Sequence, residues 1–144
     1  MSALGKILAF IVAGLIFAFL GHMVVVLPFA PLYEGEGPAW VIWAFLLAAA
    51  VISYMAPTPG KAWRRLLISS AVLALLLPIS ILLLSIAGVN DAALSAENSG
   101  AATAGAMIGG GMVTAFTGFV GFFLGAVFLI IGLLVGRDRP ANPV

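Results

Sequence analysis

Charged residues interrupt this chain at only a few points, and they leave four long uncharged segments between them. Apart from His22, those segments are residues 7–33, 37–60, 66–90 and 98–136. A helix needs ~20 apolar residues to cross the hydrocarbon core of a bilayer, so each segment is long enough for one crossing. None alternates polar and apolar residues as a barrel strand would. The pattern predicts an all-α integral membrane protein with four transmembrane helices.

The helix boundaries follow from these segments and from the prolines around them. We expect transmembrane helices at residues 6–28, 39–56, 64–88 and 108–136, packed as an antiparallel up-and-down bundle in one domain. The connections are then two outer loops, residues 29–38 and 89–107, and one cytoplasmic loop, residues 57–63. Pro78 lies inside the third helix and should kink it, with Ser80 and Ser85 placed to satisfy the backbone groups that it frees.

Composition excludes a soluble domain. Of the 144 residues, 64% are hydrophobic and 8% are charged, and the mean hydropathy is +1.27, whereas a soluble domain carries about 25% charged residues. The absence of cysteine removes disulfides, thiolate metal sites and cysteine nucleophiles. No basic stripe is present, so nucleic acid is not an expected partner.

All six basic residues fall on one side of the predicted bundle, and the acidic residues of the other two connections fall on the opposite side. The basic residues are Lys6, Lys61, Arg64, Arg65, Arg137 and Arg139. The acidic residues of the outer connections are Glu34, Glu36, Asp91 and Glu97. The positive-inside rule then places both termini in the cytoplasm. Either topology signalling or contact with anionic lipid head groups is expected of Lys61, Arg64, Arg65, Arg137 and Arg139.

The abundance of alanine, glycine, leucine and valine indicates a GC-rich bacterium. The expected location is therefore the bacterial inner membrane, with the chain crossing it several times and both ends in the cytoplasm.

Glycine recurs every seven residues along the last predicted helix. The positions are Gly111, Gly118, Gly125 and Gly132, and Gly121 lies on the same face and forms a GxxxG pair with Gly125. Small residues let membrane helices approach closely, so this face should pack against another helix. The first predicted helix has a small line of its own, made of Gly14, Ala18 and Gly21. We expect these two faces to pack together, with Gly21 near the level of Gly118; a second copy or another subunit is the alternative.

His22 is the one ionisable side chain expected at membrane depth, which makes it a functional candidate. Residues 18–22, Ala-Phe-Leu-Gly-His, resemble the AxxxH pattern of bacterial light-harvesting polypeptides over five residues with two fixed positions. That resemblance implies bacteriochlorophyll ligation by His22, although those polypeptides cross the membrane once. Axial ligation of haem is a related hypothesis. We favour a structural histidine that is hydrogen-bonded near the outer surface, so no cofactor or metal is predicted.

Recognisable catalytic motifs are missing from the sequence. It contains no Ser/His/Asp set, HExxH motif or metal-ligand spacing, so we expect no enzyme. We expect a non-catalytic accessory or structural subunit of a larger inner-membrane complex, which packs through the glycine-lined face and contacts lipid. One alternative is a homo-oligomeric channel or transporter for ions or small solutes, lined by Thr103, Thr114 and Thr117. The other is a pigment- or haem-binding subunit that uses His22.

Overall fold

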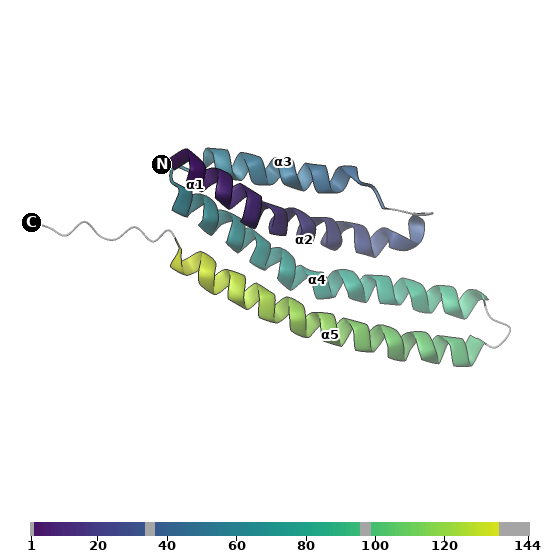
Figure 1. Cartoon of the computed structure of the whole chain (residues 1–144). Coiled ribbons are helices and arrows are strands. Elements are labelled where there is room, and N and C mark those ends of the chain that lie inside the picture. The colour runs from purple at the N-terminus through teal and green to yellow at the C-terminus, as the bar shows by residue number, and fades with distance from the viewer. Residues whose placement is uncertain (1, 34–36, 96–98, 136–144) are drawn as a thin grey trace, which may run out of the picture.

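The computed structural model describes residues 2–33, 37–95 and 99–135, and these residues are almost entirely helical (Figure 1). The N-terminal helix is continuous and comprises α1 (Ser2–Ala9), the π-helical η1 (Phe10–Gly14), α2 (Leu15–Val26) and the 3-10 segment η2 (Leu27–Leu32). It is followed by α3 (Trp40–Met55), α4 (Pro59–Ser95) and α5 (Ser99–Leu134). Three of the described helices are long and apolar enough to cross a membrane, and α3 is a shorter apolar helix. The architecture is that of a helical membrane protein.

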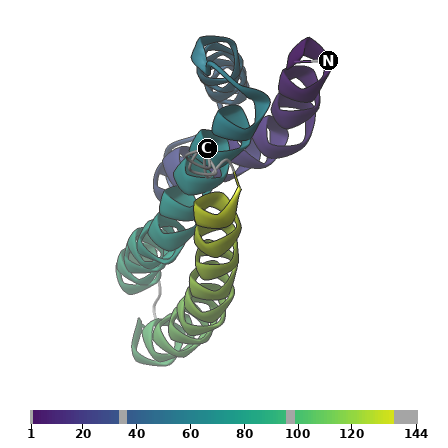
Figure 2. The ribbon, with the colours of Figure 1, turned by 90° about the vertical axis from the view of Figure 1, so that its left-hand side faces the viewer.

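Consecutive helices run in alternate directions, and α4 is the element that joins them (Figure 1). It packs against α1, η1, α2, η2 and α3 on one side and against α5 on the other. Among the described elements, α5 packs against α4 alone. Seen from the end, α5 therefore lies away from α1 and α3 (Figure 2).

The buried core lies where the N-terminal helix, α3 and α4 meet. Its largest cluster contains Ala13, Phe17, Ala49, Leu66 and Leu67, and a second cluster contains Ala9, Ala56 and Ala62. Five of these eight residues are alanines, and their small side chains let the helices pack closely there. The Phe17 ring meets the Phe45 ring edge to face, with centroids 5.5 Å apart. The core thus holds α1–α4 together, and α5 is attached from outside it.

The connection between α3 and α4 is shorter than expected, so the predicted loop at residues 57–63 is wrong. Helix α4 already begins at Pro59, because proline suits the first helical position, where an N–H would have no partner. Thr58 caps the helix, since its Oγ1 accepts a hydrogen bond of 3.3 Å from the Lys61 N–H.

The expected outer loop at 89–107 is also wrong, because helix occupies residues 89–95 and 99–107. Gly109, Gly110 and Gly111 do not interrupt α5. These stretches are rich in alanine, the best helix former, and two long helices lying side by side support each other. With 37 residues α4 is about 55 Å long, whereas a hydrocarbon core is about 30 Å thick.

Two prolines shape the path of the chain. Helix α4 changes direction about midway, and Pro78 lies near its centre (Figure 1). Pro28 lies in η2 and cannot donate a hydrogen bond to the Val24 carbonyl, four residues earlier. The buried Ser80 hydroxyl of α4 donates to that carbonyl at 2.8 Å. The expectation that Ser80 serves the kink at Pro78 is therefore wrong, since it satisfies a carbonyl that Pro28 frees in another helix.

Candidate functional site

The glycine-lined face of α5 lies against α4. A Cβ atom built on Gly121 would lie 2.6 Å from the Ala74 carbonyl oxygen and 3.3 Å from the Pro78 ring. A Cβ on Gly125 would lie 2.8 Å from the Leu75 side chain and 3.2 Å from the Ala71 carbonyl oxygen. Further along, Gly132 meets Ile68 and Leu67 in the same way. The absence of side chains at these positions is what lets the two helices come this close.

The closest approach coincides with a carbonyl that has lost its helical partner. Pro78 has no N–H, so the Ala74 carbonyl, four residues earlier, receives no hydrogen bond from it. At Gly121 a Cα–H bond occupies the direction in which a side chain would meet that oxygen. Contacts of the Cα–H···O type recur at helix–helix interfaces and are weakly favourable. Pro78 and Gly121 are thus complementary features of one interface.

The structure does not pair this face with the first helix, so that expectation is wrong. The small line of the N-terminal helix instead faces α3: Gly14 lies beside Ala49, and Gly21 lies beneath the Phe45 ring. Ala18, which lies between the two glycines in sequence, is also buried. Each small face therefore packs on the helix that adjoins it along the chain. The physical reason is that a smooth face permits close approach but does not specify which neighbour makes it.

The partner surface on α4 was not identified from the sequence. Ala71 and Ala74 are both 1% exposed, and with Pro78 they form a small surface at spacings of three and four residues. This spacing places them on one face of a helix. The spacing is visible in the sequence, but alanine is so common in this chain that it does not distinguish this face of α4.

In the other half of the α4–α5 pair, hydroxyl groups from the two helices lie next to each other. The Thr114 hydroxyl donates to the Gly110 carbonyl at 2.8 Å, and the Ser85 hydroxyl donates to the Ile81 carbonyl at 2.9 Å. The two hydroxyl oxygens are 3.3 Å apart. They border an open groove of about 270 Å³ between the two helices. Thr103 and Thr117 are half-buried and do not line this groove.

Not every predicted packing residue is covered. No other described helix comes within 4 Å of a Cβ atom built on Gly111, and at Gly118 the nearest atom is Pro78 Cβ at 3.8 Å, an ordinary contact. Gly105 and Gly109 are also open. The seven-residue glycine line therefore runs from a covered part near the core to an open part at the other end of α5.

His22 lies in α2 with a half-buried side chain. Its Nδ1 atom is buried and has no hydrogen-bond partner among the described atoms. The hydrogen bond expected of His22 is therefore not made through this nitrogen. His22 lines neither the α4–α5 groove nor a second groove, which lies between α1–η1 and α3.

The described basic residues gather at one end of the molecule. The start of α1 meets the start of α4, since a Cβ on Gly5 would lie 2.9 Å from Pro59. This brings Lys6 to the same end as Lys61, Arg64 and Arg65. Arg137 and Arg139 lie outside the described residues, as do Glu34, Glu36 and Glu97. The side chain of Asp91 is not described either.

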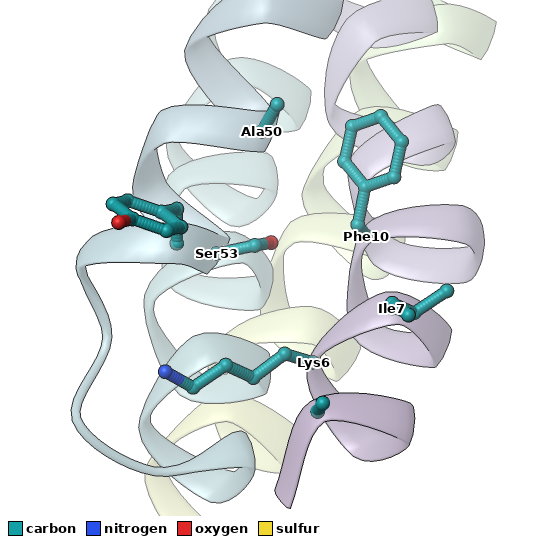
Figure 3. Close-up of a pocket in the computed structure, with 7 residues that line it drawn as sticks. Lys6, Ile7, Phe10, Ala50 and Ser53 are labelled. Atoms are coloured by element: carbon teal, nitrogen blue, oxygen red, sulfur yellow. The ribbon is translucent and has the colours of Figure 1, made fainter.

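A groove of about 420 Å³ opens between α1–η1 and α3 at this basic end (Figure 3). One wall comes from Ala3, Lys6, Ile7 and Phe10, and the other from Ala50, Ser53 and Tyr54. Figure 3 shows the Lys6 side chain reaching toward α3 and the Ser53 hydroxyl pointing toward α1. Phe10 is the first residue of the π-helical segment, a local widening that is frequent at functional sites. Sequence reasoning missed this groove because neither Ser53 nor the π-helical segment belongs to a recognisable motif.

No three His, Asp, Glu or Cys side chains come together to hold a metal ion within the described ranges. Comparison with known proteins gives no match, whether with protein-family models, curated proteins or solved structures.

Proposed function

We propose that this chain is a non-catalytic subunit of a larger complex in the bacterial inner membrane, and that it docks through the exposed face of α5. We define that face by Gly105, Gly109, Met112, Phe116 and Phe123. It lies on the side of α5 opposite the glycines that contact α4, at about 100° per residue. Met112 and Phe116 are both 70% exposed.

The observation that carries the proposal is the open pair Gly105 and Gly109. They are one helical turn apart, and within the described ranges no atom of another helix lies within 4 Å of a Cβ built on either. Glycine in a helix costs about 1 kcal/mol against alanine, and a lipid-facing position gains nothing in return. A small pair of this spacing does gain from contact with another helix. Because α5 packs against α4 alone among the described helices, we infer that the contacting helix belongs to a partner.

The proposed membrane placement has four crossings with both termini in the cytoplasm. It is supported by the alternating helix directions and by the basic residues at one end. Helix α3 has 16 residues, or about 24 Å, and is the shortest crossing. The exposed Trp40 and Trp43 near its start and Tyr54 near its end suit the two membrane interfaces.

Native mass spectrometry tests the proposal on protein extracted from its own membrane in mild detergent. Other membrane subunits should copurify in fixed stoichiometry. Gly109→Ile should remove them, because a branched side chain would separate the two helices. Gly100→Ile is the matched control, since Gly100 is equally open and lies nine residues, or about 180°, around the same helix. Equal effects of the two substitutions would contradict the proposed docking face.

The competing hypotheses predict other results in the same experiment. A colourless homo-oligomer would favour the channel or transporter and would lead to flux assays. A visible absorption band would favour the pigment or haem hypothesis and make His22 the first residue to substitute.

A further inference from the structure

The groove between α1–η1 and α3 contains a buried hydroxyl without a partner. Ser53 is 5% exposed, and its Oγ atom has no hydrogen-bond partner among the residues that the structure describes. A serine within a helix commonly donates to the carbonyl four residues earlier, but Ser53 does not. Leaving such a group unpaired is unfavourable. Ser70 is also buried and unpaired, yet it lines neither groove, so Ser53 is the one with adjoining space for an acceptor.

The groove is also positively charged at one end and apolar at the other. Lys6 supplies the charge, and none of the lining residues is acidic. Ile7, Phe10 and Ala50 supply an apolar wall. Along the groove, Figure 3 shows Lys6 first, then the Ser53 hydroxyl, then Phe10 and Ala50. The order is therefore a cation, a hydrogen-bond donor and an apolar surface.

We propose that this groove binds one anionic phospholipid of the cytoplasmic leaflet. Its phosphate lies at Lys6, an ester or phosphate oxygen accepts a hydrogen bond from Ser53, and the first part of an acyl chain lies against Phe10 and Ala50. Basic pockets between helices on the cytoplasmic side are a recognised setting for such lipids. The volume of about 420 Å³ is within the range of small-molecule sites, about 300–1,000 Å³. The site shares no residue with the proposed docking face of α5, so either proposal can fail alone.

Lipid retention in native mass spectrometry tests this site on the full chain. Phosphatidylglycerol and phosphatidylcholine with the same acyl chains are added to delipidated protein at equal concentration. The unchanged protein should retain phosphatidylglycerol about fivefold better, the effect of one lysine at an anionic surface. Lys6→Gln should abolish that preference. Ser53→Ala should lower retention of both lipids about threefold, the effect of one hydrogen bond.

Two matched controls distinguish the groove from general attraction to a basic surface. Arg65→Gln removes the same charge from an exposed position at the same end, outside the groove, and should leave the preference unchanged. Ala50→Phe fills the groove and should remove the retained lipid, whereas Ala44→Phe, at an exposed position of the same helix, should not. Equal retention of the two lipids by the unchanged protein would overturn the proposal. So would equal losses from Lys6→Gln and Arg65→Gln, or from Ala50→Phe and Ala44→Phe.

Discussion

The α2–α3 and α4–α5 interfaces both depend on glycine, but the atoms that the glycine accommodates differ. In α2, Gly21 makes room for the ring of Phe45, a side chain that can rotate. In α5, Gly121 makes room for the Ala74 carbonyl oxygen, a backbone atom that moves only with its helix. The same residue type therefore has different tolerance to substitution at the two interfaces. The comparison shows that the cost of replacing a glycine depends on what it faces.

The largest expected effect is the presence or absence of a disulfide crosslink. The chain has no cysteine, so an introduced pair supplies its only two thiols. A Cβ on Gly132 would lie 3.3 Å from Leu67 Cβ, and one on Gly14 would lie 3.2 Å from Ala49 Cβ, close to the usual disulfide separation of about 3.5–4.5 Å. Gly132→Cys with Leu67→Cys, and Gly14→Cys with Ala49→Cys, should crosslink on mild oxidation in membranes.

The negative control for crosslinking pairs the two faces that were expected to meet. Gly21→Cys with Gly118→Cys should not crosslink within one chain, because α2 and α5 are not packed together. An intramolecular crosslink there, seen as a mobility shift on non-reducing gels, would contradict the packing of α5 on α4.

Gly121→Ala should destabilise the protein by about 3 kcal/mol, the upper part of the range for overpacking, because the Ala74 carbonyl cannot move away. Reversible unfolding in mixed micelles, followed by circular dichroism, measures this. Gly111→Ala is the control, since nothing lies near it, and it should be neutral or stabilising by up to about 1 kcal/mol. Similar stability of the two variants would argue against the close α4–α5 approach.

Gly21→Ala should cost less, about 1–2 kcal/mol, because the Phe45 ring can turn aside. The same unfolding measurement applies. Adding Phe45→Leu should recover part of the loss, since the smaller side chain leaves space for the new methyl group. If the double variant is no more stable than Gly21→Ala, the ring is not what limits this interface.

Ser80→Ala should have the smallest effect, about 0.6 kcal/mol, the average for hydrogen bonds between helices in membranes. It removes the bond to the Val24 carbonyl that Pro28 leaves without a donor. Combining it with Pro28→Ala supplies a backbone donor and should reduce the effect of Ser80→Ala toward zero. If a double-mutant cycle shows no coupling between the two substitutions, the effect of the Ser80 hydrogen bond does not depend on Pro28.

The comparison also shows how far the sequence could predict the fold. Uncharged segments and prolines predicted the apolar helices, because burying backbone groups in lipid allows few alternatives. The glycine face was recognisable because spacing alone defines it. Its partner was harder to recognise, because Ala71, Ala74 and Pro78 share one helix face by their spacing but alanine is common throughout this chain. Similarly, the acceptor for Ser80 lies 56 residues away in sequence, which local patterns do not reveal.

The candidate groove was still less accessible to sequence reasoning. Lys6 was interpreted as a topology signal, and Ser53 looked like one of several serines in an apolar helix. Their relation depends on the spacing between α1 and α3, which is a property of the packed helices. The unpaired state of Ser53 is likewise visible only in three dimensions.

Because α5 packs against α4 alone among the described helices, it can join the other helices last during synthesis and detach from them first. Helix α5 leaves the ribosome after the other described helices have been made, so α1–α4 can assemble before it arrives. Until α5 docks, the Ala74 carbonyl is not covered by Gly121 and receives no hydrogen bond from Pro78. Docking then covers that oxygen, and undocking exposes it again. Amide hydrogen exchange should therefore show α5 opening as one cooperative unit, before the α1–α4 core.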